Sequence, residues 1–267
     1  MRTFRSIAFA GTLLAANFAA GGAFAQSAAD AANALAAGGQ GAFAGAEAGI
    51  SSADMVQVLE QAAAAGDPLA MWRLGVMYES GTGVEQDRVK AFGYFSRIAD
   101  ENADAAPKSI EADIVAQSFV KMGDYYRVGL PGAGITADQN ESRALLFHAA
   151  SYFGDPEAQY KLGLVYLDED NPGSALQGAR WLALAAHKGH VGAMAVLGDL
   201  LFNGDRIEQQ PVEGLMWLNL AHQRTKGSED ETWVAELLNR DSSIATPEQR
   251  KQALDAANAV SSQIASN

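Results

Sequence analysis

Four histidines and no cysteine restrict the metal sites that this chain can form. A protein zinc site combines thiolates, imidazoles and carboxylates around the ion. His187 and His190 are three residues apart, but they span an expected helix end. Neither a cysteine nor a pair of carboxylates lies near them in the sequence. We therefore expect no metal site.

Two loop sequences have the composition of other ligand sites but lack the required pattern. The acidic turn at residues 168–171 carries carboxylates that suit calcium, yet it lacks the length and the terminal Glu of an EF-hand loop. Residues 129–134 are rich in glycine, but no strand precedes them, as a phosphate-binding loop requires. The sequence also lacks the signatures of serine hydrolases, zinc proteases and cysteine nucleophiles. We expect no cofactor and no enzymatic activity.

Histidine is also the side chain that changes its charge near neutral pH. The best candidate for a pH sensor is His148, because Phe147, Ala149 and Ala150 place it in an apolar seam of the expected fold. A histidine that the fold holds neutral must take up a proton when the fold opens in acid. The alternative is a structural role, since all four histidines fall on or just after expected helices, where a protonated imidazole interacts favourably with the helix C-terminus.

The elements that must position these residues follow an internal repeat. Its pattern is a Gly, then an Ala, a Leu-Gly pair and an aromatic residue. The copies are Gly66/Ala70/Leu74-Gly75/Tyr78, Gly154/Ala158/Leu162-Gly163/Tyr166 and Gly189/Ala193/Leu197-Gly198/Leu201, with a degenerate copy at Met122-Gly123/Tyr126. A period of about 35 residues is typical of a stacked helical-repeat solenoid, which presents a curved surface to a partner.

We expect an all-α, right-handed solenoid of helix pairs like those of tetratricopeptide repeats. The first helix spans residues 52–65. The expected first helices of the pairs are 67–80, 110–129, 155–168 and 190–203, the second helices are 87–102, 138–152, 174–188 and 211–225, and helices 229–240 and 247–264 close the chain. Glycine inside a helix costs about 1 kcal/mol relative to alanine. The recurrence of Gly75, Gly123, Gly163 and Gly198 therefore predicts close approach of a partner helix at each of them.

The chain divides into three regions. Residues 1–25 carry two arginines, an apolar stretch and Ala23-Phe24-Ala25, a pattern typical of a secretory signal that is cleaved before Gln26. Residues 26–51 are mostly Ala, Gly and Ser, which indicates a flexible leader. Residues 52–267 form the solenoid with its closing helices. No later segment approaches the roughly 18 apolar residues of a membrane span, so we expect no stable membrane insertion.

The charge of the mature chain restricts its partners. Cleavage removes Arg2 and Arg5, which shifts the formal net charge from −13 to −15. Such an excess of carboxylates disfavours nucleic acid and anionic membrane surfaces as partners. Export without a single cysteine, behind a signal of bacterial type, predicts the periplasm, with secretion from the cell as the alternative.

The expected partner-binding groove lies along the first helices of the pairs. We expect residues three before the repeat Gly, one after it and one after the aromatic residue to point into this groove. The residues selected in this way are Trp72, Glu79, Asp124, Arg127, Tyr160, Asp199 and Phe202. Aromatic residues among charges are typical of protein-binding surfaces. The alternative for the three aromatic residues is packing against neighbouring helices.

The repeat pattern resembles the Sel1-like repeat. The residues that carry this resemblance are Ala70, Leu74-Gly75, Tyr78, Gly81-Thr82-Gly83-Val84, Asp87, Ala91 and Tyr94 in one copy, and Trp181, Ala185-Ala186 and Gly189 in another. Three good copies and one poor copy make the resemblance specific. It implies an all-α binding solenoid.

A closer resemblance covers nearly the whole chain. Together with the signal region, residues 91–99, 149–155, 196–205 and 214–218 are similar to the ExoR family of exported alphaproteobacterial regulators of exopolysaccharide synthesis. This resemblance implies a periplasmic protein that binds the periplasmic domain of the sensor kinase ExoS and keeps the ExoS-ChvI system off. It also implies removal by a periplasmic protease in acid. The alternative function is a peptide-binding or scaffolding module for envelope assembly.

Overall fold

The computed structural model describes residues 52–171 and 173–265. The expected signal and leader, residues 1–51, lie outside the described residues. The described helices are α2 (Ser52–Ala64), α3 (Pro68–Ser80), α4 (Arg88–Asn102), α5 (Ala112–Val128), α6 (Gln139–His148), α7 (Pro156–Asp168), α8 (Ser174–His187), α9 (Val191–Asn203), α10 (Pro211–Arg224), α11 (Glu231–Ile244) and α12 (Pro247–Ala265). The expected all-α architecture is confirmed.

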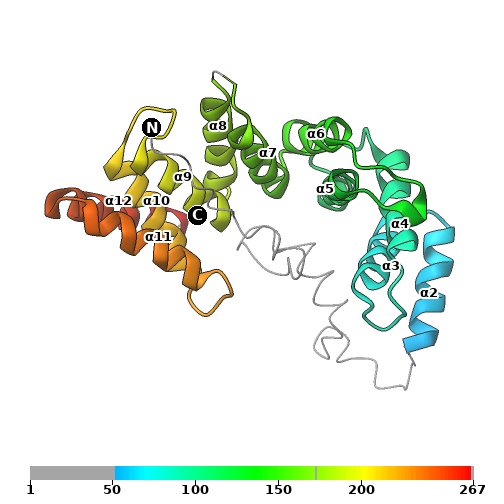
Figure 1. Ribbon diagram of the computed structural model, residues 1–267. Helices are drawn as coiled ribbons and strands as arrows, with labels where there is room; N and C mark the ends of the chain where they lie inside the picture. Colours follow the sequence, from blue (N-terminus) through cyan, green and yellow to red (C-terminus); the bar gives the residue numbers. More distant parts are fainter. Residues whose placement is uncertain (1–51, 172, 266–267) are drawn as a thin grey trace, which may run out of the picture.

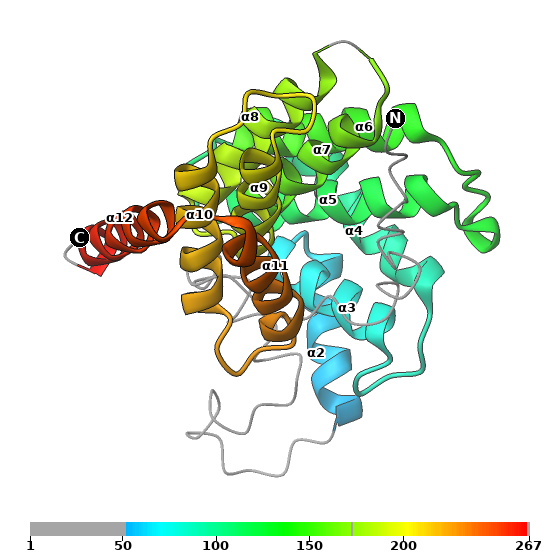
Figure 2. The same ribbon diagram turned by 60° about the vertical axis from the view of Figure 1, so that its left-hand side comes forward.

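Successive helices stack in chain order into an arch, with α2 to α4 at one end and α11 and α12 at the other (Figure 1). The antiparallel pairs are α3/α4, α5/α6, α7/α8 and α9/α10. The first helices of these pairs, together with α11, lie on the concave side of the arch, and the second helices lie on its outer side (Figures 1 and 2). This arrangement places one row of first helices side by side along a single face.

Short polar caps fix where these helices begin. The carboxylates of Asp67, Asp87 and Asp138 each accept two backbone N–H groups at the starts of α3, α4 and α6. Asp155 accepts the backbone N–H of Ala158 at 2.7 Å at the start of α7. Such caps satisfy donors that the first helical turn leaves unpaired. The expected helix starts are therefore correct to within two residues.

The glycines inside the helices allow the close contact that the repeat predicts. A Cβ atom at Gly163 would lie 2.8 Å from Cγ of Leu182, and one at Gly75 would lie 2.6 Å from the ring of Phe95. Between α9 and α10 the neighbouring atom belongs to the backbone, since a Cβ at Gly198 would lie 2.8 Å from the carbonyl oxygen of Gly214. These distances leave no room for a methyl group, which explains why glycine recurs where it is otherwise unfavourable.

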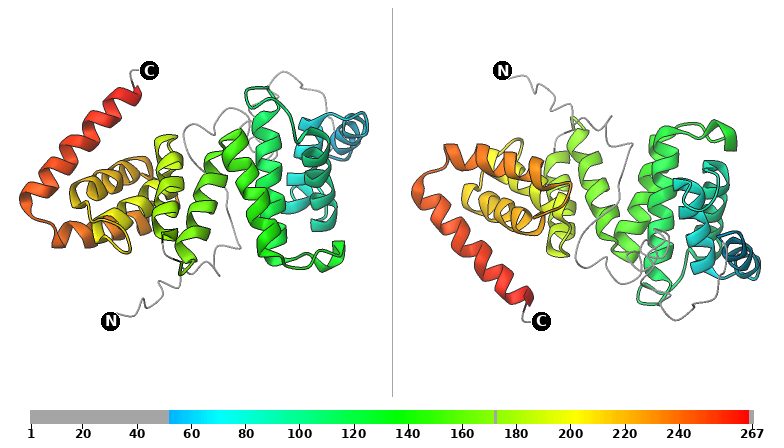
Figure 3. Two further views of the ribbon diagram at one scale, coloured as in Figure 1. Left: turned by 90° about the horizontal axis from the view of Figure 1, so that it is seen from above. Right: turned by 90° about the horizontal axis from the view of Figure 1, so that it is seen from below.

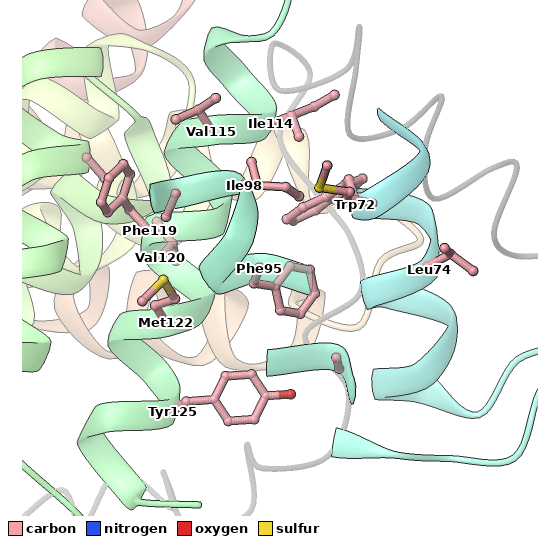
Figure 4. Close-up of a cluster of buried hydrophobic side chains, with 14 of the residues drawn as sticks. Trp72, Leu74, Phe95, Ile98, Ile114, Val115, Phe119, Val120, Met122 and Tyr125 are labelled. Atoms are coloured by element: carbon pink, nitrogen blue, oxygen red, sulfur yellow. The ribbon is translucent and has the colours of Figure 1, made fainter. Parts of the chain in front are cut away.

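Aromatic and aliphatic side chains fill the space between neighbouring repeats. In the N-terminal half, Trp72 of α3 contacts Phe95 of α4 with ring centroids 5.2 Å apart. Figure 4 shows Trp72 and Phe95 in one cluster with residues of α5, among them Phe119, Met122 and Tyr125. A second buried cluster continues from Tyr160 to Ala257. The core therefore runs along the solenoid and has no single centre, as expected for stacked repeats.

Three features depart from the expected regularity. The helix expected to run through residue 152 changes at Ala149 into a π-helical turn, Ala149–Phe153, which ends at Gly154 with a φ of 71°. The loop after α5 contains a 3-10 turn, Pro131–Ala133, and an isolated bridge between Leu130 and Ile135. The last helix, α12, packs on α10, and it diverges from the neighbouring α11 (Figure 3). Periodicity cannot reveal these features because they depend on turn geometry or on packing against other helices.

The glycine contacts give a matched pair of tests. Gly198→Ala should destabilise the protein by about 2 kcal/mol, because backbone atoms of α10 must move to make room for the methyl group. Gly93→Ala in α4 should be neutral or stabilising by up to about 1 kcal/mol, since the added Cβ meets nothing within 4 Å. Urea unfolding followed by circular dichroism measures both. Equal stabilities for the two variants would contradict the close-contact explanation.

Candidate partner-binding face

A series of ion pairs, with one histidine–carboxylate contact, connects α3, α5, α7, α9 and α11 along the concave side; these five helices are called the first-type helices below. Here this series is called the concave ladder. Its pairs are Glu79–Lys121 between α3 and α5, Asp124–Lys161 between α5 and α7, Glu157–His190 between α7 and the start of α9, and Asp199–Arg240 between α9 and α11. Each pair joins one repeat to the next along this face, above the apolar core that packs between the repeats.

The repeat register explains why these side chains meet. Lys121 and Lys161 both stand two residues before a repeat Gly, and Asp124 and Asp199 both stand one residue after one. A helix turns about 100° per residue, so these two positions lie about 160° and about 100° from the glycine, on the side that faces the concave surface. A cation of one repeat therefore meets a carboxylate of the repeat before it.

Lys161 is the centre of the ladder. Its ammonium group pairs with Asp124 and lies 3.5 Å from Glu157, which also contacts His190 at 2.8 Å. Burial alone would raise the pKa of Glu157, but Lys161 and His190 outweigh burial and hold that pKa at about 2. Burial disfavours the charged form of Lys161, yet the two carboxylates raise its pKa. Both groups therefore stay ionised in the folded protein at neutral pH.

His190 has two roles at this junction. Its Nδ1 accepts the backbone N–H of Ala193 at 3.0 Å and caps α9, while its Nε2 faces Glu157. The imidazole ring stacks on Tyr160 with centroids 4.5 Å apart. Because Nδ1 accepts a hydrogen bond, the neutral ring carries its proton on Nε2 and donates it to Glu157. This single side chain links the cap of α9 to the ladder.

The expectation of exposed aromatic residues on this face is wrong. Trp72 is 3% exposed, Phe202 is 5% exposed and Tyr160 is 9% exposed. Around the helix axis, the residue three before the repeat Gly lies only about 60° from that glycine, which faces the partner helix. Trp72 and Tyr160 occupy this position, so their side chains point into the seam between helices. Phe202 packs where α9 approaches Gly214 of α10. These three residues stabilise the fold and are not available to a partner.

The expected charged residues do reach the surface, although most of them have internal partners. Glu79 pairs with Lys121 and also accepts a hydrogen bond from the hydroxyl of Tyr125 at 3.2 Å. Asp124 and Asp199 belong to the ladder. Arg127 is the exception, since its side chain is 55% exposed and its contact with Asp124 measures 4.0 Å. Arg127 is therefore the expected site residue that is most available to a partner.

The cationic half of the ladder and Glu157 were not among the predicted partner-binding residues. The missed residues are Lys121, Glu157, Lys161, His190 and Arg240. The sequence does contain the pattern. Lys161 stands two residues before its repeat Gly, and Asp124 stands one residue after the Gly of the preceding repeat. Lys121 holds the same position as Lys161, and its partner Glu79 stands four residues after the preceding Gly. Comparing residues within one repeat does not reveal pairs that form between repeats.

His148 lies away from the concave ladder, at the end of α6. Its Nε2 lies 3.1 Å from the carbonyl oxygen of Ala103, and its ring contacts Phe119 at 4.6 Å and Tyr152 at 5.3 Å. The seam expected for His148 is therefore present, and the ring ties α6 to the loop after α4. Whether this residue senses pH stays a prediction.

Among the residues that the structure describes, no three His, Cys, Asp or Glu side chains gather closely enough to hold a metal ion. Within the same part of the chain, no helix has both the length and the apolar character needed to cross a bilayer.

The central junction gives a pH-dependent prediction. Glu157→Gln should lower the free energy of unfolding at pH 7 by roughly 1–2 kcal/mol, since partial exposure weakens the pair with Lys161. In the folded protein the pKa of Glu157 lies below its ordinary value of 4.5, so the ion pair stabilises the fold fully above pH 4.5. This stabilisation is lost as the pH falls toward 2. The two proteins should therefore converge in stability below about pH 4.5. Urea titrations from pH 7 to pH 3 measure this, with Glu208→Gln in an exposed loop as the control. A difference that persists unchanged at pH 3 would rule out the ion pair as its source.

Comparison with known proteins gives the family. Four segments match the Sel1 repeat, at residues 68–102, 120–151, 156–190 and 191–221. The chain is 33% identical over 208 residues to the exopolysaccharide production negative regulator of Rhizobium leguminosarum bv. viciae, covering 78% of this chain and 75% of the relative. It is 31% identical over 202 residues to the protein of the same name from Rhizobium meliloti (strain 1021), covering 75% of this chain and 73% of that one.

A solved structure supports the fold independently. A Sel1 repeat protein from Oxalobacter formigenes superimposes with a TM-score of 0.57 at 23% identity, covering 78% of this chain and 80% of that chain. The matched segments coincide with the four helix pairs from α3 to α10. The chain belongs to the Sel1-repeat family of exopolysaccharide production negative regulators.

Proposed function

We propose that the protein is a periplasmic negative regulator of exopolysaccharide production that binds the periplasmic domain of a sensor histidine kinase and keeps the kinase inactive. The names of its relatives support the regulatory role. The Sel1-repeat architecture supports a protein-interaction module, because stacked repeats offer an extended surface and no enclosed site. The kinase, its inhibition and the periplasmic location follow from the resemblance to the ExoR family.

The observation that carries this proposal is the continuous concave face. The ladder connects five first-type helices, and the exposed side chain of Arg127 stands near the end of α5, one of these helices. Charges paired in this way are already oriented and partly desolvated, so a partner meets a preformed surface and loses little entropy on binding. Electrostatic complementarity on such a surface favours specificity.

Removal by a periplasmic protease in acid is the second part of the proposal. Asp155 cannot drive acid opening, because burial raises its pKa to about 6, so its protonation between pH 7 and pH 5 favours the fold. The pair of Glu157 is lost only below pH 4.5. A response in mild acid therefore requires another group, and His148 connects α6 to the loop after α4 through Ala103.

The alternative is a scaffolding or peptide-binding module for envelope assembly. A pull-down from the periplasm distinguishes the two functions. Recovery of a sensor kinase, together with a changed regulon when the gene is deleted, supports the proposal. Recovery of envelope-assembly proteins without a kinase would replace it.

Arg127→Glu should weaken binding to the purified periplasmic domain of the kinase at least about tenfold. Arg127 is the most exposed of the charged residues predicted for the concave face, and the substitution reverses its charge. The matched control is Arg180→Glu, an exposed position on the outer helix α8, which should leave affinity unchanged. Isothermal titration calorimetry measures both, and circular dichroism checks their folding. Equal affinities for the two variants would exclude the concave face at α5 as the contact.

His148→Gln should reduce acid-induced opening between about pH 7 and pH 5.5, since glutamine keeps a donor for Ala103 and stays neutral. The measurement is the rate of limited proteolysis at several pH values. His187→Gln, at the end of α8, is the control. Identical pH profiles for wild type and His148→Gln would discard His148 as the sensor.

A further inference from the structure

The concave ladder changes character between α7 and α9. Its central pair uses the position one residue after a repeat Gly and the position two residues before the next, where Asp124 and Lys161 stand. One repeat further along the chain, the same two positions hold Leu164 and Val196. Both positions lie on the side of the helix that faces the concave surface. Two apolar side chains therefore occupy the places where the preceding step has an ion pair.

Further apolar side chains extend this step across α9 and onto α11, which contacts α9. Leu200 stands four residues after Val196, so both lie on one side of α9. On α11, Leu237 and Trp233 stand three and seven residues before Arg240, the ladder residue of that helix. These side chains are half-buried and pack on the C-terminal apolar cluster. Together they are called the concave apolar patch, which consists of Leu164, Val196, Leu200, Trp233 and Leu237.

The cations beside the patch already have carboxylate partners within the chain. Lys161 pairs with Asp124 and lies 3.5 Å from Glu157. Arg240 pairs with Asp199 on the other side of the patch. An acidic ligand would have to break these pairs to reach a positive charge.

Further carboxylates give the surroundings of the patch a negative sign. Asp230 and Glu236 stand three residues before and three residues after Trp233 on α11. The carboxylate of Asp230 accepts the indole N–H of Trp233 at 2.7 Å, which orients the ring. Burial raises the pKa of Tyr160, and the charges of Glu157 and Asp230 raise it further, so the negative potential extends to α7. A ligand that matches this patch is both apolar and positively charged.

We propose, on the basis of the function proposed above, that the concave apolar patch is the anchor site of the concave face. The partner places a large apolar side chain against it, flanked by Lys or Arg. A tryptophan among half-buried aliphatic residues, with polar groups around it, has the composition of an interface hot spot. The exposed cation Arg127 on α5 meets a different, acidic part of the same partner. The two ends of the face thus have opposite polarity, which sets the direction in which the partner lies along it.

The test extends the ionic ladder through the patch. Leu164→Asp combined with Val196→Lys copies the pair of Asp124 and Lys161 into the next repeat, so the fold should be kept. The probe is a short, fluorescently labelled amphipathic peptide of leucine and lysine, and its binding is followed by fluorescence anisotropy. Its affinity for the double variant should be at least about tenfold lower than for the wild type. The matched control is Leu254→Asp, at a position 45% exposed on α12, which should bind as the wild type does.

Two reference peptides separate the apolar contribution from the ionic one. Alanine replaces leucine in the first and glutamate replaces lysine in the second, and each should bind the wild type at least about tenfold more weakly. The proposal is overturned if the leucine–lysine peptide does not bind the wild type, binds the double variant equally well, or binds no better than the reference peptides. Circular dichroism verifies folding, and Leu237→Lys replaces the double variant if that variant does not fold.

Titration calorimetry with the purified periplasmic domain of the kinase keeps the two proposals distinguishable. A loss of affinity of at least about tenfold in the double variant supports both of them. Unchanged affinity in the double variant, with weakened binding in Arg127→Glu, would reject the anchor site and leave the proposed function standing. A wild type that binds the leucine–lysine peptide at the patch but does not bind the kinase domain would contradict the proposed function alone.

Discussion

Ion pairs between successive first-type helices hold the repeats of this solenoid in a fixed relation. Within a pair of helices, close backbone contact at glycine sets the geometry, and the contact between Gly198 and Gly214 leaves no space for adjustment. Between pairs, Lys161 connects carboxylates of two first-type helices. A solenoid has only nearest-neighbour contacts, so its curvature is the sum of these local arrangements. The concave face depends on each of them.

This arrangement changes what a partner can recognise. The carboxylates of Glu79, Asp124 and Asp199 are already satisfied by cations of the chain itself. A partner must therefore bind beside paired charges or compete for them, and competition would loosen the contact between repeats. Arg127 is the most accessible of these charges, because its side chain is 55% exposed and its contact with Asp124 is long, at 4.0 Å.

The sequence predicted most of the fold but only part of the site. Helix positions followed from apolar periodicity and from caps such as Asp67 and Asp155, which act locally. The exposure predicted for Trp72 was wrong and its packing, the alternative, holds, because the seam lies close to the glycine side of the helix. The ladder was missed because its pairs form across repeats. The π-helical turn after His148 and the divergence of α12 depend on tertiary packing, which periodicity does not encode.

The central claim is that the concave row of first-type helices is the binding face for a sensor kinase. Hydrogen exchange of the mature chain, measured with and without the purified periplasmic domain of the kinase, tests it most directly. The account predicts slower exchange in α5 and α7, around Arg127 and Lys161, with α6 and α8 unchanged. Protection confined to the outer helices α6 and α8 would contradict it.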